Sequence, residues 1–402
     1  MSFLDRLLGR PTLENLIQDT TRWLKSQGST DIEALPDRME IRHRRGNGVN
    51  TLALANLWRE YQNASRGERQ AVLQRFLASV MVEDAIPPDY ASARPRLMPV
   101  LRSASGMALT RQGTAAGASP GSFAAQRPLV ADIVVALVVD LPSSMVYVNE
   151  GTLADWGVTW EQAHADALDN LRGLPEHGGW KAIAPGVWSG EWGDAYESSR
   201  LLLPDLIHRV GIGDPVAMVP FRNALLLTSA ANTEGIERLV RLAHDAMDTQ
   251  GRWVSFELLR LQGTAWTRFE PSGAAATTQA AALLRSQADD YEGQRKMLEE
   301  QFEAQNVDLF VASYTLFQKE GEALTSYSVW SEDVDTLLPQ SASVVLLHKD
   351  GDDTWHVRLP WQVVRDKFGH LMEATEHLPV RYRVRQFPDR GQLHALAETA
   401  AL

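Results

Sequence analysis

The chain has 402 residues, enough for two or three domains that each bury a core of their own. Its 51 acidic and 39 basic residues give a net charge of -12, which disfavours nonspecific binding to nucleic acid or anionic lipid. The absence of cysteine excludes disulfides, thiolate metal ligands and thiol nucleophiles. We therefore expect no metal site and no cofactor.

The first residues, MSFLDRLLGRPT, lack the apolar segment and the cleavage site of a secretory signal. The longest strongly apolar run, residues 129–139, contains Asp132 and is far shorter than the ~20 residues that span a bilayer. We therefore expect a cytoplasmic protein without a transmembrane helix.

Residues 1–90 are predicted to form a helical N-terminal region that contains one β-hairpin. The hairpin sequence, MEIRHRRGNGVNTLAL, includes Asn47-Gly48, a pair suited to the positive φ angles of a tight turn. Two helices are predicted to follow over residues 54–62 and 67–82.

Residues 91–127 are predicted to form a flexible linker, because they are rich in Pro, Ala, Gly and Ser. The segment carries arginines and has no acidic residue after Asp89. Its positive charge is suited to an acidic partner, but it is equally suited to the acidic surface of the chain itself. The arginines are Arg94, Arg96, Arg102, Arg111 and Arg127.

Residues 128–265 are predicted to form an α+β core domain. The apolar run IVVALVV is typical of a central strand buried on both faces, and residues 145–148 are predicted to pair with it. Thr159 and Gln162 have the spacing of a capping box at the start of an amphipathic helix. Further strands and helices are expected to complete a sheet covered by helices.

Five sequence blocks between residues 127 and 262 resemble a known family. They are LVVDLPSSMVYVNE, LADWGV, HADALDNL, GDAYESSRLLLPDL and GDPVAMVPFRNALLL. They are similar to blocks of the YtpQ-like family of uncharacterised bacterial proteins, which is known only as a domain of unknown function. The resemblance is compatible with the N-terminal helices and does not cover the C-terminal domain. It implies a fold but no site, because the family has no established activity.

Residues 277–402 are predicted to form a second α+β domain, after a break at PSGAAATTQ (271–279). A long amphipathic helix is expected first, then four strands, a short helix that begins with Pro360 and stops near Gly369, and the closing strand VRYRVRQF. The whole chain is thus expected to be α+β, with a helical N-terminal region and two mixed domains.

The formal catalytic motifs are weak. GASPG matches the Gly-x-Ser-x-Gly nucleophile elbow, but Pro120 has no N–H to offer after Ser119, so we interpret the match as chance. No glycine-rich loop has the spacing of a nucleotide site. His164 is a catalytic candidate if Asp140 and Ser143 approach it across one cleft. The alternative is a histidine that packs on the edge of an apolar stripe.

Two segments are candidate binding surfaces. Trp188, Trp192 and Tyr196 share an acidic loop, which is typical of peptide or cation recognition but also of a loop folded over the core by its own tryptophans. In VRYRVRQF, strand alternation places Arg381, Arg383 and Arg385 on one face. If the strand that carries His356 and Arg358 were adjacent, the sheet would present a basic stripe. The alternative is a solvated face neutralised by neighbouring acids.

Three functions follow as hypotheses. We favour a noncatalytic cytoplasmic protein-interaction protein, an adaptor or chaperone-like module, because recognition surfaces outnumber catalytic sets. The first alternative is a metal-independent hydrolase that uses a cleft near His164. The second is a polyanion or nucleic-acid binder that uses the basic C-terminal strand.

Overall fold

The computed structural model shows an α+β protein with 41% helix and 30% strand, arranged in several mixed and antiparallel sheets. The residues that the structure describes are 11–36, 39–45, 48–65, 67–81, 86–114, 120–141, 145–175, 178–250, 253–350 and 353–400. They fall into two compact units. The first consists of residues 1–99, 137–174 and 246–252, and the second of residues 100–136, 175–245 and 253–402.

The N-terminal part of the first unit mixes strands with helices. Three antiparallel strands form one sheet in the order β1-β2-β3. The prediction of a helical N-terminal region is therefore wrong, because β1 joins the expected hairpin and makes it a sheet. The elements are α2 (Leu13–Ser26), β1 (Thr30–Leu35), β2 (Glu40–Arg45), β3 (Gly48–Ala53), α3 (Ala55–Asn63) and α4 (Arg69–Met81).

The hairpin of β2 and β3 lies where the sequence predicts it. Arg45 pairs with Gly48, so Gly48 is already part of the strand, and Asn47 lies outside the described residues. The side chain of Thr12 caps α2 by accepting a hydrogen bond from the Asn15 N–H. The sheet and helices enclose one apolar core, formed by Leu16, Leu24, Ile41, Leu52, Leu54, Leu57, Tyr61, Val72, Leu73 and Leu77.

The remainder of the first unit contains the capping box that the sequence predicts. Thr159 and Gln162 exchange hydrogen bonds at the start of α8 (Trp160–Arg172). The division between the units passes through β6 (Ile133–Asp140), whose buried run confirms the expected central strand. Its second half pairs with β7 (Met145–Tyr147), and α7 (Glu150–Asp155) follows.

The segment expected to be a flexible linker is largely ordered. Six of the seven residues of β4 are buried, and β4 leads directly into a helix. The prediction fails because an apolar strand, LMPVLRS, lies within the Pro-, Ala- and Ser-rich composition. The elements are α5 (Tyr90–Ala93), η2 (Arg94–Arg96), β4 (Leu97–Ser103), α6 (Ala104–Thr114) and η3 (Pro120–Ser122).

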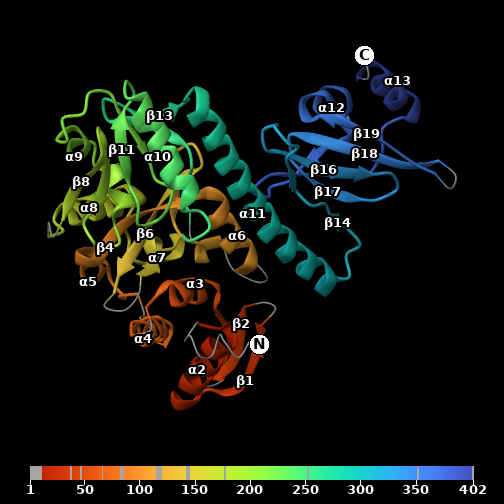
Figure 1. Cartoon of the computed structure of the whole chain (residues 1–402). Coiled ribbons are helices and arrows are strands. Elements are labelled where there is room, and N and C mark those ends of the chain that lie inside the picture. Colours follow the sequence, from red (N-terminus) through yellow and green to blue (C-terminus); the bar gives the residue numbers. More distant parts are fainter. Residues whose placement is uncertain are drawn as a thin grey trace. The chain divides into compact units, whose positions relative to one another are not determined.

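The second unit contains a six-stranded antiparallel sheet in the order β13-β12-β10-β11-β9-β8. The helix α10 packs against this sheet and against α11, and both helices are labelled in Figure 1. The elements are β5 (Gln126–Val130), β8 (Gly179–Ala184), β9 (Val187–Glu191), η4 (Ser198–Leu202), α9 (Pro204–His208), β10 (Pro215–Met218), β11 (Leu226–Ser229), α10 (Thr233–Asp245), β12 (Leu258–Gln262) and β13 (Ala265–Phe269).

The helix α11 (Gly273–Gln305) is 33 residues long and contacts both α6 and the C-terminal strands (Figure 1). The expected break at residues 271–279 is not observed, because most of that segment forms the first turns of this helix. Its three consecutive alanines favour helix strongly. Asn306 ends the helix in the left-handed conformation.

The C-terminal part contains two four-stranded sheets, in the orders β14-β17-β21-β20 and β15-β16-β18-β19. The predicted helix that begins after Pro360 and stops near Gly369 is confirmed as α12. The elements are β14 (Phe310–Val311), β15 (Thr315–Phe317), β16 (Thr325–Ser331), β17 (Thr336–Pro339), β18 (Ser343–Asp350), β19 (Asp353–Pro360), α12 (Trp361–Phe368), η5 (Gly369–Leu371), β20 (Glu373–Ala374), β21 (Arg381–Val384) and α13 (Arg390–Ala400).

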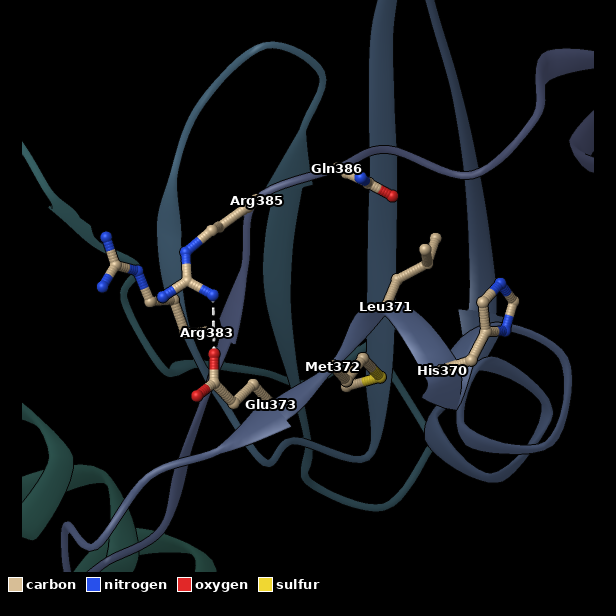
Figure 2. Close-up of a pocket in the computed structure, with 7 residues that line it drawn as sticks. All are labelled: His370, Leu371, Met372, Glu373, Arg383, Arg385 and Gln386. Atoms are coloured by element: carbon tan, nitrogen blue, oxygen red, sulfur yellow. Dashed lines mark hydrogen bonds and ion pairs between the residues drawn. The ribbon is translucent and has the colours of Figure 1, made fainter.

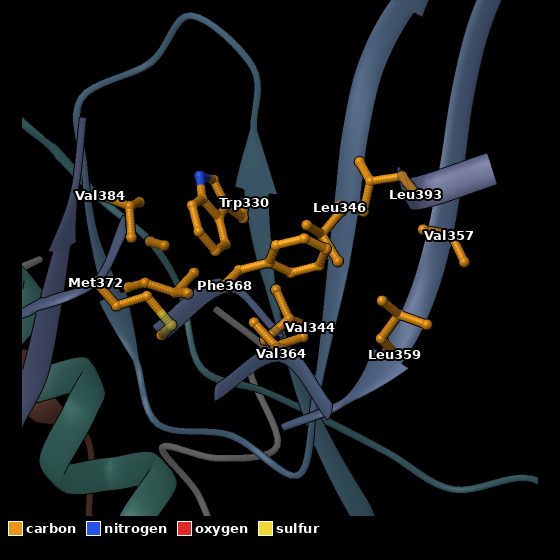
Figure 3. Packing of buried hydrophobic residues seen from close by; sticks show 12 residues of the cluster. Trp330, Val344, Leu346, Val357, Leu359, Val364, Phe368, Met372, Val384 and Leu393 are labelled. Atoms are coloured by element: carbon orange, nitrogen blue, oxygen red, sulfur yellow. The ribbon is translucent and has the colours of Figure 1, made fainter. Parts of the chain in front are cut away.

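One apolar core joins these sheets and helices. Figure 3 shows Phe368 of α12 surrounded by strand residues, with Trp330 and Met372 near it. Leu393 brings α13 to the same core. No helix among the residues that the structure describes is long and apolar enough to cross a membrane.

Candidate functional site

A pocket of about 290 Å³ lies beside the end of β21, in the C-terminal part of the second unit. Basic, acidic, amide and apolar side chains meet there, which is the composition of a recognition site. The lining residues are His370, Leu371, Met372, Glu373, Arg383, Arg385 and Gln386. Two of them, Arg383 and Arg385, are binding residues that the sequence predicts.

Two short elements shape the pocket. The edge strand β20 pairs antiparallel with β21, with Glu373 opposite Arg383. The turn η5 precedes β20, because Gly369 ends α12 and the Met372 N–H donates back to the Gly369 carbonyl. Met372 is buried in the apolar core, so η5 and the start of β20 are held firmly against the domain.

Arg385 is the less occupied of the two arginines that line the pocket. Its Nη1 donates to the Glu373 carboxylate at 2.6 Å, the contact marked in Figure 2. The two side chains are 53% and 65% exposed. A guanidinium has five N–H donors, and the others on Arg385 have no partner among the residues that the structure describes. They are available to an anionic ligand.

Arg383 is more fully occupied than Arg385. Its Nε and Nη2 bind the two carboxylate oxygens of Asp335 at 3.0 and 2.6 Å. These hydrogen bonds hold the pKa of Asp335 below its usual range, and Asp335 in turn raises the pKa of Arg383. Arg383 therefore lines the pocket mainly as a fixed positive charge.

Arg381 does not belong to this surface, although strand alternation placed it on the same face. It is fully buried, and its guanidinium donates to neutral acceptors instead of a carboxylate. Its partners are the Gln294 side chain and the carbonyls of Ala312, Leu337 and Tyr291, at 2.5 to 3.1 Å. Burial lowers the pKa of Arg381 to about 10, so it stays charged at neutral pH.

The expected basic stripe across two neighbouring strands is not formed. His356 and Arg358 lie on β19, which belongs to a different sheet from β21. Arg358 lies over the Phe317 ring at 4.1 Å and donates to Ser343 at 2.7 Å. Acidic partners from adjoining segments occupy Arg383 and Arg385, as the alternative interpretation proposed.

The aromatic residues of the acidic loop face inward. Trp192 and Tyr196 are buried, and Trp188 on β9 is half-buried. Trp192 packs edge-on against Trp180 with 5.2 Å between ring centroids, and the Arg200 guanidinium lies over it at 4.3 Å. These contacts hold the loop on its own core, as the alternative interpretation proposed.

A buried ion pair fixes the same loop. Arg200 donates to both carboxylate oxygens of Asp194, at 2.9 and 2.5 Å. Although burial alone would raise it, the pKa of Asp194 is lowered by this arginine and by the Tyr196 N–H. Both carboxylate oxygens of Asp194 are therefore bound by Arg200.

The described members of the proposed catalytic set, His164 and Asp140, are not joined by a hydrogen bond. The ring of His164 stacks on Trp160 at 5.6 Å, and its buried Nε2 has no hydrogen-bond partner among the described residues. No hydrogen bond joins it to Asp140 in the part of the chain that the structure describes, and Ser143 lies outside that part, as does Ser119. Burial lowers the pKa of His164, which keeps the ring neutral at pH 7.

A second group of titratable side chains lies where the β5–β6 turn, the segment before β12 and α11 meet. Asp132 accepts a hydrogen bond from Ser255 at 2.5 Å, and Arg268 approaches Glu257 at 3.5 Å. Burial raises the pKa of Asp132 and of Glu257. It raises the pKa of Asp290 to about 7, with Asp132 and Asp289 adding to the effect.

Among the described residues, which include this carboxylate group, no three or more His, Asp or Glu side chains are placed to hold a metal ion. Sequence reasoning did not identify the group, because its members are about 30 to 160 residues apart and are separated by several elements. The sequence analysis also missed Glu373 and His370. The only local indication of them was the predicted end of a helix at Gly369.

Comparisons with protein-family models, with curated proteins and with solved structures find no match for this chain. The resemblance to the YtpQ-like family therefore stays a prediction that rests on the sequence blocks quoted above.

Proposed function

We propose that this protein is a noncatalytic interaction protein that binds an acidic group of a protein partner in the pocket beside β21. The observation that carries the proposal is Arg385, whose guanidinium has spare N–H donors in a pocket that also contains Leu371 and Met372. Charge-assisted hydrogen bonds to a carboxylate combined with apolar contact are typical of peptide recognition.

The chemistry of the pocket favours a carboxylate of a peptide over a long polyanion. Of the three arginines on the strand, Arg381 is buried and Arg383 is held by Asp335. Only a short basic surface remains, which suits one acidic side chain and not a phosphate chain that needs several cations in a row.

Fluorescence anisotropy with short labelled peptides tests the proposal. The probe is a peptide of alternating threonine and valine with glutamate at its centre, and the matched probe has glutamine there. We expect the glutamate peptide to bind about two- to fivefold more tightly, because an ion pair to a half-exposed arginine contributes about 0.4 to 1 kcal/mol.

The variant Arg385→Gln should lose that preference. A matched control is Arg209→Gln, which removes an exposed arginine paired with Asp205 on α9, outside the pocket. Equal affinity for the two peptides, or equal loss of binding in the two variants, would overturn the proposal.

A further inference from the structure

β21 is paired with β17 on one side and β20 on the other, but the main chain of Arg385, just past the end of β21, has no partner strand on the β20 side among the described residues, and this position indicates the shape of the ligand. On the basis of the proposed function, we infer that the ligand is an extended peptide strand. It pairs with the main chain of Arg385 beyond the end of β20, and its acidic side chain replaces Glu373 on the Arg385 guanidinium.

The register of β20 and β21 shows which groups lie on this side. Glu373 is opposite Arg383, Ala374 is opposite Tyr382, and the Thr375 N–H donates to the Arg381 carbonyl. In an antiparallel pair, the residues that exchange hydrogen bonds alternate along the strand. The main-chain groups of Arg385 therefore point to the same side as those of Arg381 and Arg383.

In the part of the chain that the structure describes, no strand pairs with Arg385 on that side. Leu371 would be the partner of Arg385 in the same register, but it belongs to η5. The Met372 N–H is turned back to the Gly369 carbonyl. The N–H and carbonyl of Arg385 make no main-chain hydrogen bond among the described residues, so an added strand could satisfy them.

Glu373 already makes the contact to Arg385 that we infer for the acidic residue of the ligand. It is an acidic side chain on an extended segment, and it reaches Arg385 diagonally across the strand pair at 2.6 Å. Because both side chains are largely exposed, this contact is weak and can be exchanged for an incoming carboxylate. Glu373 would then act as a built-in competitor.

Figure 2 shows how the side chains frame this position. The guanidinium of Arg385 is turned toward Glu373, while Leu371 and Gln386 lie on the other side of Arg385. An extended peptide presents alternate side chains to opposite faces. A strand along Arg385 would thus place its acidic residue near the guanidinium and an apolar residue near Leu371.

Two measurements with the glutamate peptide test the inference. First, Glu373→Gln should raise the affinity two- to fivefold by removing the competitor, whereas Glu376→Gln, which changes an exposed glutamate outside the pocket, should not. Second, among peptides N-methylated at one residue at a time, the one methylated at the residue that donates its N–H to the Arg385 carbonyl should lose affinity fivefold or more, and its neighbours should not.

The outcomes separate this inference from the proposed function. If Arg385→Gln abolishes the glutamate preference while Glu373→Gln and every N-methylated peptide leave affinity unchanged, the pocket binds a carboxylate but not a strand, and the inference is wrong. If Arg385→Gln leaves binding unchanged, both are wrong.

Discussion

Strand alternation places Arg381 and Arg385 on the same face, at the two ends of β21, but one is buried and the other is exposed. Arg381, at the start, is fully buried and bound by four neutral acceptors. Arg385, just past the end, is 53% exposed and bound by one carboxylate. The difference shows that strand alternation determines the side on which a residue lies, while the elements packed on that side determine its role.

At the start of β21 the covering element is α11. The Gln294 side chain and the Tyr291 carbonyl of this helix accept from Arg381, and the Tyr291 hydroxyl donates to the Val380 carbonyl. No helix supplies comparable acceptors to Arg385 among the described residues. Arg381 therefore joins α11 to the sheet, and Arg385 remains available for binding.

Replacement of Arg381 by methionine should have the largest effect. It removes the Arg381 donor from the Gln294 side chain and from three carbonyls, of which the Leu337 carbonyl still accepts from the Ala312 N–H. We expect the free energy of unfolding to fall by roughly 3 kcal/mol. Urea denaturation followed by circular dichroism measures this loss. A decrease below about 1 kcal/mol would show that Arg381 is not a structural residue.

The same helix, α11, carries a half-buried carboxyl group, Asp290, for comparison with the buried guanidinium of Arg381. Because the folded-state pKa of Asp290 is raised to about 7, its stabilising contribution is complete below its unfolded pKa and is lost as pH rises through 7. The protein should therefore be less stable at pH 8 than at pH 5. Asp290→Asn should remove roughly 2 kcal/mol of this difference. Thermal unfolding at both pH values measures it, and an unchanged difference would contradict the assignment.

His164, in the first unit, has a buried ring nitrogen, Nε2, without a hydrogen-bond partner among the described residues, whereas Arg381 has four acceptors. The ring of His164 stacks on Trp160. His164→Phe keeps the ring and removes the polar atom, so it should raise stability by about 1 kcal/mol. A higher melting temperature supports this assignment, whereas a clear loss of stability would indicate that His164 has a polar partner.

Replacement of Arg385 by glutamine should have the smallest effect on stability. The side chain is exposed and its ion pair with Glu373 lies on the surface, so the free energy of unfolding should change by less than about 0.5 kcal/mol. The same urea denaturation measures it. A loss as large as that of the Arg381 variant would remove the distinction between the two ends of β21.

The sequence predicted correctly those elements whose defining pattern lies within a few consecutive residues. The buried run of β6, the capping box at Thr159 and the helix after Pro360 are examples. The strand β1 was missed because its residues are mostly exposed and show no apolar alternation. The strand β4 was missed because the surrounding composition suggested a linker.

The site was only partly predictable for a physical reason. Arg383 and Arg385 follow from the alternation of one strand, but Asp335 and Glu373 are brought to them by sheet pairing. The burial of Arg381 depends on Gln294, which is 87 residues away in the chain. No local pattern contains such contacts.

The central claim is that an acidic strand binds the edge at Arg385, and amide hydrogen exchange of residues 380–387 tests it most directly. Addition of the glutamate peptide should slow exchange at the Arg385 amide, and the glutamine peptide should have no such effect at the same concentration. Unchanged exchange at Arg385 with saturating glutamate peptide would contradict the claim.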